Sequence, residues 1–230
     1  MPGVVNRAVR VAIDGPGGAG KTSVARAVAD RLGVDCLDTG AMYRAVAAAV
    51  LRRDVRLDDK EAVAEVARKV VAGIDVGVDA VRLEGVDVTE EIRGTTVTEA
   101  VSTVAANREV REVMVARQQA WARAREGCVM EGRDITTVVL PEADVRVYLS
   151  ADSAVRARRR SGESGGNEAA VRAALSERDR LDSTRSHAPL PAPEDLPAEV
   201  RPIDTTHSTV GDVVAEIMGM IEALPGRRSQ

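Results

Sequence analysis

Residues 9–22 read Val-Arg-Val-Ala-Ile-Asp-Gly-Pro-Gly-Gly-Ala-Gly-Lys-Thr, and this stretch decides the fold. Residues 9–13 are mostly apolar, which is typical of a buried strand, and a glycine-rich turn follows Asp14. Residues 15–22 match the G-x-x-x-x-G-K-[ST] pattern at every fixed position. We expect a helix from about residue 20 to residue 32. A strand, this turn and a helix in succession predict a phosphate-binding loop.

The residue types of this loop suit a nucleoside triphosphate with Mg²⁺. Backbone N–H groups of the glycines can point at phosphate oxygens, and the helix that follows adds the positive end of its dipole. Lys21 can reach the β- and γ-phosphates, and the Thr22 hydroxyl can bind Mg²⁺, with Ser23 as a nearby alternative. A glycine-rich turn that binds nothing is the alternative, which the flanking strand and helix disfavour. The expected triphosphate-binding residues are Gly15, Pro16, Gly17, Gly18, Ala19, Gly20, Lys21, Thr22 and Ser23, with Thr22 as the metal ligand.

The rest of the chain predicts an α/β fold of the P-loop NTPase type, with a parallel sheet flanked by helices. A strand over residues 34–37 leads to Asp38, Thr39 and Gly40, and we expect Thr39 to cap a helix that ends near residue 53. Strands and helices that alternate in this way form parallel sheets covered on both faces. Further strands are expected at 128–130, 145–149 and 202–204, and further helices at 60–72, 97–105, 108–125, 152–160, 168–182 and 209–224.

Two segments interrupt this alternation. Residues 73–88 alternate apolar and polar side chains between turn residues, which is typical of short antiparallel strands. We therefore expect a small β insert at 73–97 within a P-loop core formed by residues 1–72 and 98–230. Residues 161–167 are polar and rich in glycine, so we expect a mobile lid at about 156–168.

Composition excludes several classes of protein. The chain has 230 residues, 32 basic and 36 acidic, and its net charge of −4 argues against a nucleic-acid partner. Its longest apolar run, from Ala45 to Leu51, is far shorter than the ~20 residues that a membrane-spanning helix needs. The first residues contain no apolar signal segment, and Cys36 and Cys128 lie far apart without metal-ligand spacing. We expect a cytoplasmic protein with reduced thiols and without a membrane partner.

Two classes of protein use such a loop, and the lysines distinguish them. A GTPase needs a guanine-reading Asn-Lys-x-Asp motif, but Lys21, Lys60 and Lys69 follow Gly, Asp and Arg. A small phosphotransferase needs an arginine-rich acceptor site and a lid that carries arginines over the transferred phosphoryl group. The chain has 29 arginines beside its three lysines, and their positions support the second class.

Candidate acceptor residues follow two of the predicted strands. Arg44 lies in the helix after the strand at 34–37, and Glu131, Arg133 and Asp134 follow the strand at 128–130. The carboxyl ends of parallel strands share one sheet edge, so these side chains are expected to meet beside the loop. Arg133 could bind a phosphate, whereas the two carboxylates could accept hydrogen bonds. A solvated surface loop is the alternative.

Candidate lid arginines lie before the glycine-rich segment. Arg156, Arg159 and Arg160 share a helix end, where they could stabilise charge on the transferred phosphoryl group, although favourable charge at a helix C-terminus is an alternative. Arg178, Asp182 and Arg185 follow at i, i+4 and i+7. Spacing alone does not decide between a solvated ion pair and a binding stripe there.

Seven runs of the chain together resemble the bacterial cytidylate kinase family. LDTGAMYRA at 37–45 and GRDITTVVLPEADVRVYL at 132–149 are much more specific than the loop alone. The insert also fits, since the family carries an extra domain in its monophosphate-binding region. The other matching runs are IDGPGGAGKTSVA at 13–25, VSTVAANREVRE at 101–112, ERD at 177–179, HAPL at 187–190 and IDTT at 203–206.

The resemblance implies transfer of the γ-phosphoryl group of ATP to CMP or dCMP. It implies that Arg44, Arg133 and Arg178 hold the acceptor phosphate, that Ser102, Arg111 and Asp134 read cytosine, that Asp182 and Arg185 contact the sugar, and that Arg156, Arg159 and Arg160 with Lys21 assist the transfer. Thr39 and Glu131 complete the expected substrate site. The family usually has Asp at position 131 and often Gly or Ser at position 22.

Two other functions stay open from the sequence. One is a related phosphotransferase that acts on UMP, dTMP or a small sugar acid. The other is a non-catalytic nucleotide-binding module whose lid serves as a partner surface. We expect a monomer that acts on small-molecule nucleotides.

Overall fold

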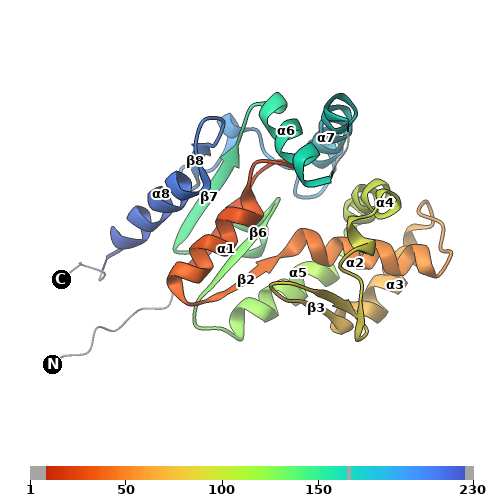
Figure 1. The fold of residues 1–230 in the computed structure, drawn as a ribbon. Helices are drawn as coiled ribbons and strands as arrows, with labels where there is room; N and C mark the ends of the chain where they lie inside the picture. Colours follow the sequence, from red (N-terminus) through yellow and green to blue (C-terminus); the bar gives the residue numbers. More distant parts are fainter. Residues whose placement is uncertain (1–8, 165–166, 226–230) are drawn as a thin grey trace.

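A five-stranded parallel sheet forms the centre of the protein. The structure, a computed structural model, describes residues 9–164 and 167–225. The strands of the sheet follow the order β2-β6-β1-β7-β8, and every neighbouring pair is parallel, which confirms the predicted fold class (Figure 1). The strands are β1 (Arg10–Asp14), β2 (Asp35–Asp38), β6 (Cys128–Gly132), β7 (Val145–Ser150) and β8 (Arg201–Asp204).

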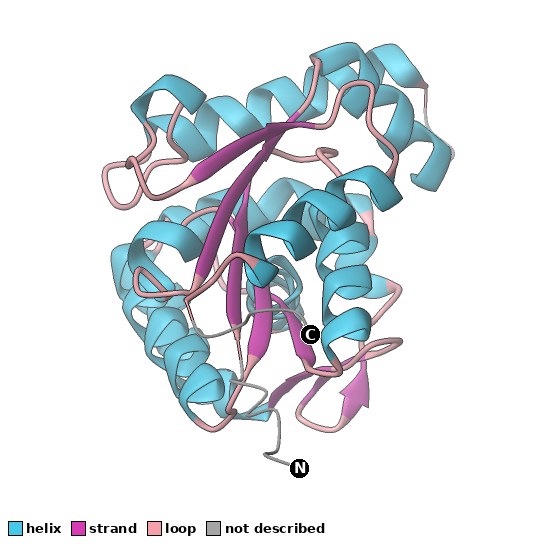
Figure 2. Cartoon of the chain, turned by 90° about the vertical axis from the view of Figure 1, so that its left-hand side faces the viewer, coloured by secondary structure: helices cyan, strands magenta, loops and turns pink. Residues whose placement is uncertain are grey.

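Helices cover both faces of this sheet (Figure 2). Side chains of β1 alternate between two cores, since Ala12 faces one and Val11 and Ile13 face the other. Both cores consist mainly of aliphatic side chains, since the chain has no Phe, and among the described residues Tyr43 is the one buried aromatic side chain of the core that Ala12 faces. The helices around the sheet are α1 (Lys21–Leu32) and α8 (Val210–Glu222) on the Val11 side, and α2 (Thr39–Arg52), α3 (Lys60–Val70), α4 (Thr95–Ala106) and α5 (Arg108–Arg123) on the Ala12 side.

The predicted β insert is present as a separate antiparallel sheet. Its strands are β3 (Ile74–Val76), β4 (Val81–Leu83) and β5 (Val86–Asp87), in the order β3-β4-β5. Short 3₁₀ helices flank it at Val71–Gly73 and Glu91–Arg93. The buried faces of the insert and of α2 belong to the same hydrophobic core. The domain boundaries at 73 and 97 stay a prediction.

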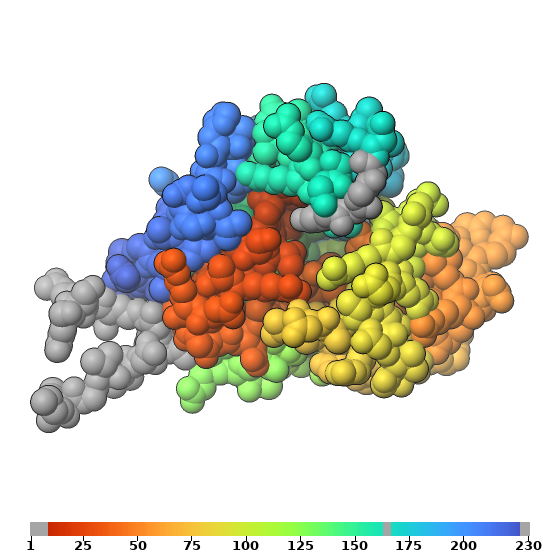
Figure 3. Space-filling view, viewed as in Figure 1, coloured from red at the N-terminus to blue at the C-terminus, as the bar shows by residue number. Residues whose placement is uncertain are grey.

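The carboxyl edge of the central sheet is covered by α6 (Ser153–Ser164) and α7 (Glu168–Thr184), which pack on each other (Figure 1). The prediction of a loop from residue 161 was wrong, since α6 continues through Ser161 and Gly162 as far as Ser164. Residues 165 and 166 of the predicted lid lie outside the described residues. In the space-filling view the segment of α6 and α7 lies directly against the phosphate-binding loop and α1 (Figure 3).

Two further boundaries differ from those expected. Asp38, not Thr39, caps α2, because the Asp38 Oδ1 accepts a hydrogen bond from the Ala41 N–H at 2.9 Å. The Thr39 hydroxyl donates instead to the Glu131 carbonyl at 2.8 Å, which ties α2 to β6. Glu131 and Gly132 complete β6 rather than following it, and a π-helical turn occupies Ile135–Val139. A short 3₁₀ helix also forms at Pro193–Asp195.

Among the described residues, no helix combines the length and apolarity needed to cross a bilayer.

Gly15 should tolerate no side chain, because the loop leaves β1 in close contact with β7. Its φ is 145°, and a Cβ atom there would lie 2.1 Å from the Leu149 carbonyl oxygen. We expect Gly15→Ala to lower the free energy of unfolding by about 3 kcal/mol. Gly219→Ala is the control, because nothing lies within 4 Å of that exposed helical position; it should stabilise α8 by up to ~1 kcal/mol. Urea denaturation measures both, and equal effects would contradict this account.

Candidate active site

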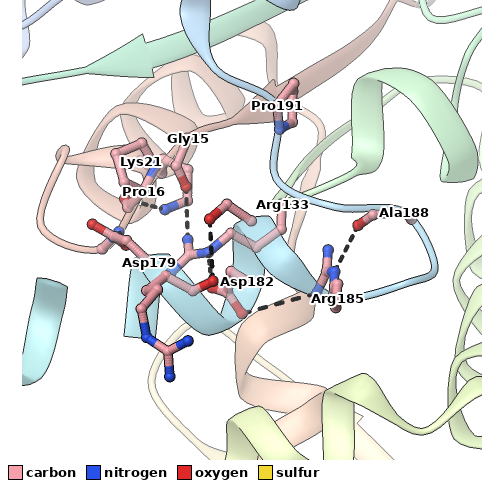
Figure 4. Close-up of polar contacts among 12 residues, drawn as sticks. Gly15, Pro16, Lys21, Arg133, Asp179, Asp182, Arg185, Ala188 and Pro191 are labelled. Atoms are coloured by element: carbon pink, nitrogen blue, oxygen red, sulfur yellow. Dashed lines mark hydrogen bonds and ion pairs between the residues drawn. The ribbon is translucent and has the colours of Figure 1, made fainter. Parts of the chain in front are cut away.

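The phosphate-binding loop follows β1 and ends at the start of α1, where the motif predicts it. Gly18 and Gly20 have positive φ values of 75° and 89°, so the backbone curls as the motif requires. The Lys21 ammonium is buried and donates to the Pro16 carbonyl at 3.0 Å (Figure 4). Burial lowers the pKa of Lys21, and the charge of Arg133 lowers it further. The loop therefore holds its lysine inside the site.

Thr22 and Glu131 place two oxygen groups side by side at the start of α1. The Thr22 hydroxyl donates to the Glu131 Oε1 at 2.5 Å, and Glu131 is 4% exposed. Burial raises the pKa of Glu131, and the nearby Asp38 raises it further. A hydroxyl and a carboxylate suit Mg²⁺, which is often held by one or two such groups together with substrate phosphates. Among the described residues, no group of three or more His, Cys, Asp or Glu side chains could hold a metal ion.

Three arginines meet beside the loop: Arg44 of α2 is buried, whereas Arg133, after β6, and Arg178 of α7 are half-buried. Arg133 donates to the Gly15 carbonyl at 2.7 Å and to the Asp182 Oδ2 at 2.8 Å (Figure 4). Burial works against the charge of Arg133, but Asp182 outweighs burial and raises the pKa. Burial, and next the charges of Arg133 and Arg44, lower the pKa of Arg178 to about 9. The Arg178 Nε is buried and has no hydrogen-bond partner among the described residues.

Arg44 is oriented differently from the other two. Its Nη1 donates to the Ile92 carbonyl and to the Thr98 hydroxyl, both at 2.8 Å. Burial, and next the charge of Arg160, lower the pKa of Arg44 to about 10. In this arrangement Arg44 is bound to the 3₁₀ turn before α4 and to α4 itself.

A small pocket of about 50 Å³ lies next to these arginines. Inside it, Arg111 and Asp134 form a buried ion pair, and the Arg111 guanidinium lies 5.9 Å from the centre of the Tyr43 ring. All the predicted substrate residues except Arg44 line this pocket. Its lining residues are Thr39, Gly40, Tyr43, Val101, Ser102, Ala105, Arg111, Glu131, Gly132, Arg133, Asp134, Arg178, Asp182 and Arg185.

A larger pocket of about 390 Å³ lies on the other side of the same loop. The loop and α1 form one wall, and the start of α8 with the turn before it forms the other. No sequence pattern predicted a role for this second wall, although the run IDTT at 203–206 belongs to the resemblance to the family. The lining residues are Gly18, Ala19, Gly20, Ser23, Val24, Arg159, Thr205, Ser208, Thr209, Val210 and Val213.

The three predicted lid arginines interact with three different parts of the site. Arg156 donates to the Gly17 carbonyl at 3.1 Å, so it lies on the phosphate-binding loop. Arg159 donates to the carbonyl and hydroxyl oxygens of Thr205 at 2.6 and 2.9 Å, at the larger pocket. The charge of Arg160 acts on Arg44 and on Arg178. Together these side chains link the larger pocket, the loop and the arginine cluster.

Known proteins are similar to this chain over almost its whole length. The model of the family described as "Cytidylate kinase" matches residues 11–223. The chain belongs to the cytidylate kinase family. A cytidylate kinase from Rhodococcus opacus (strain B4) is 44% identical over 94% of this chain and 96% of that protein. A cytidylate kinase from Caldanaerobacter subterraneus subsp. tengcongensis is 44% identical over 93% of this chain and 95% of that protein.

The fold recurs in a solved structure of much lower sequence identity. An uncharacterized protein from Eubacterium ventriosum ATCC 27560 aligns with a TM-score of 0.51 and 13% identity, over 94% of this chain and 99% of that chain. At this identity the alignment shows the shared fold alone.

One departure from the cytidylate kinase pattern has a structural consequence. The resemblance implies Asp at position 131, where this chain has Glu131, whose carboxylate accepts a hydrogen bond from the Thr22 hydroxyl. It also lines the small pocket, so a single side chain borders both the loop and the predicted acceptor site.

Asp14 is a positioning residue for which no sequence motif predicts a role. Its carboxylate is fully buried and accepts hydrogen bonds from the Ile135 N–H at 2.8 Å and from the N–H and hydroxyl of Thr136, each at 2.7 Å. Burial raises the pKa of Asp14 to about 6, although these hydrogen bonds oppose the shift. Asp14 thereby fixes the segment that carries Arg133 and Asp134 to the strand that carries the loop. A charged residue at the end of an apolar strand was the only sign of this in the sequence.

Replacing Asp14 should therefore destabilise the fold. We expect Asp14→Ala to lower the free energy of unfolding by about 3 kcal/mol, because three buried donors lose their acceptor. The double variant Asp14→Ala/Thr136→Val should recover part of this loss, since it removes the unpaired hydroxyl. Asp75→Ala is the control, because Asp75 is exposed. Thermal unfolding of the four proteins tests this, and full stability of Asp14→Ala would contradict it.

Proposed function

We propose that this chain transfers the γ-phosphoryl group of ATP to CMP or dCMP, giving CDP or dCDP and ADP. The observation that carries the proposal is the position of Arg133. Its guanidinium bonds the loop carbonyl of Gly15 and also Asp182 of the small pocket, so the triphosphate loop and the acceptor site share one side chain. Membership of the cytidylate kinase family supports CMP as the acceptor and ATP as the donor.

In this proposal the donor occupies the loop and the larger pocket. Its phosphates bind the loop N–H groups and Lys21, and its nucleoside extends into the 390 Å³ pocket beside Arg159 and α8. The Thr22 hydroxyl and the Glu131 carboxylate would hold Mg²⁺ together with phosphate oxygens. When bound, the ion would neutralise part of the phosphate charge.

The negative acceptor phosphate would bind the positively charged arginine cluster. Arg178 and Arg133 are half-buried beside the loop, and a phosphate dianion supplies acceptors that match guanidinium donors. The Arg111 and Asp134 pair suits the cytosine edge, because the guanidinium can donate to the ring acceptors while the carboxylate accepts from the exocyclic amine. Ser102 would add a hydroxyl to base recognition, and Asp182 and Arg185 would contact the sugar.

The small pocket must widen to admit a nucleotide. Its volume of about 50 Å³ compares with ~300 Å³ or more for typical ligand sites. The pocket is formed by α2, α4, α5 and α7 around the end of β6, so α4 and α7 have to move apart before CMP enters. Closure afterwards would exclude water and limit hydrolysis of ATP.

Transfer needs no covalent intermediate on the protein. The acceptor phosphate is anionic near pH 7 and is itself the nucleophile, so no strong general base is required. Lys21 and the arginines at 156, 159 and 160 would stabilise charge on the transferred group. We further propose that the protein acts as a cytoplasmic monomer without a nucleic-acid or membrane partner.

A panel of acceptors tests the substrate assignment. ADP formation from ATP is followed by a coupled assay with CMP, dCMP, UMP, dTMP, AMP and a small sugar acid. We expect kcat/KM for CMP or dCMP to exceed that for UMP and AMP by at least ~10²-fold, because UMP would place an oxygen against the Asp134 carboxylate. A preference for UMP, AMP or the sugar acid over both cytidine nucleotides would refute the assignment.

Arg160→Ala separates an enzyme from a non-catalytic nucleotide-binding module. We expect kcat for CMP phosphorylation to fall by at least ~10²-fold, the weight of an arginine that stabilises a phosphoryl transition state. Arg158→Ala is the matched control, because Arg158 is an exposed neighbour on the same helix. Equal activities of the two variants would contradict a catalytic role for the lid.

A further inference from the structure

The Asp179 carboxylate contacts both the phosphate-binding loop and a lid arginine. Its Oδ1 accepts a hydrogen bond from the Gly17 N–H at 3.4 Å, and its Oδ2 accepts from the Arg156 Nη1 at 2.5 Å. The same Arg156 Nη1 also donates to the Gly17 carbonyl at 3.1 Å. The side chains of Arg156 and Asp179 are 11% and 20% exposed. The transfer mechanism above assigns no task to this carboxylate.

Helix α7 is seated closely on the loop at this point. Leu175, one turn before Asp179, is buried, and a Cβ atom at Gly17 would lie 2.8 Å from the Leu175 Cδ2. Gly17 therefore contacts α7 through Leu175 and through Asp179, and it contacts α6 through Arg156. The contact is a packed one, which holds the carboxylate in place on the loop.

The Asp179 carboxylate uses groups that a triphosphate also uses. A loop N–H and a guanidinium are the donors that bind phosphate oxygens in sites of this kind. A carboxylate and a phosphate are both anions, so they repel each other when they approach the same donors. The donor triphosphate must therefore compete with Asp179 for the Gly17 N–H and for Arg156.

We propose that Asp179 is a positioning residue that holds Arg156 on the phosphate-binding loop and weakens the binding of the donor triphosphate. This inference rests on the proposed function, since it takes the loop as the triphosphate site. When the triphosphate binds, the Asp179 carboxylate leaves the Gly17 N–H, and Arg156 becomes available to the γ-phosphoryl group. Asp179 thus lowers the affinity of the loop for the donor triphosphate and at the same time places Arg156 on the loop.

Asp179→Asn tests the inference, because it keeps the size of the side chain and one acceptor oxygen but removes the charge. Isothermal titration without an acceptor nucleotide gives the Kd for ATP and, separately, for inorganic tripolyphosphate. We expect both ligands to bind roughly tenfold more tightly to the variant, since a like charge is removed from the site. With CMP present, kcat should fall because Arg156 loses its partner, while KM for ATP also falls. A merely structural defect would weaken binding rather than tighten it.

The control is Glu177→Gln on the same helix. Glu177 forms an exposed ion pair with Arg180, and its removal should change neither Kd nor kcat. Asp179→Ser serves as a second variant where Asp179→Asn fails to fold. Unchanged or weaker binding of ATP and tripolyphosphate by the folded Asp179 variant overturns the inference. If the unmutated protein does not bind ATP, the proposed function itself is wrong. If the unmutated protein phosphorylates CMP but the Asp179 variant binds ATP no more tightly, only the role of Asp179 is wrong.

Discussion

Mutual repulsion between buried guanidinium groups is the constraint on which the site depends. Burial lowers the pKa of Arg178, and the charges of Arg133, Arg44 and Arg160 lower it further. Asp182 compensates part of this charge through its ion pair with Arg133. Burial alone would raise the pKa of Asp182, but Arg133 and Arg178 outweigh it and hold it below its usual range. A dianionic phosphate is the ligand that relieves such a cluster.

The order of the strands brings these charges together. Because β6 lies between β2 and β1, the residues that end these three strands are neighbours at one sheet edge. Asp38 at the end of β2, Glu131 in β6 and Asp14 at the end of β1 are each held there by a hydrogen bond to a neighbouring element. Arginines of α2, α6 and α7 also lie near this edge. Placement of the site is therefore a direct consequence of a parallel sheet.

Much of this arrangement was predictable from local patterns. The loop motif, the alternation of strands and helices and the antiparallel insert each depend on residues close together in the sequence. Two contacts were not predictable in this way. Asp38 and Thr39 can both cap a helix, and the choice depends on the Glu131 carbonyl, which takes the Thr39 hydroxyl from 92 residues away. Helix α6 continues through Gly162 although its composition favours a loop, and α6 packs against α7.

The roles of side chains in the acceptor pocket came from the family resemblance, since spacing alone left an ion-pair stripe as an alternative for Arg178, Asp182 and Arg185. The two walls of the 390 Å³ pocket and the Asp179 contact bring together distant segments of the chain, so no local pattern indicated them.

Comparison of CMP with cytidine tests the central claim, namely that buried arginines require the acceptor phosphate. Both ligands carry the same base and sugar, so any difference in Kd comes from the phosphate. Isothermal titration should give a Kd for CMP at least ~10²-fold below that for cytidine, because charge-assisted hydrogen bonds to the guanidinium groups are made by CMP alone. Equal affinities of the two ligands would contradict the account.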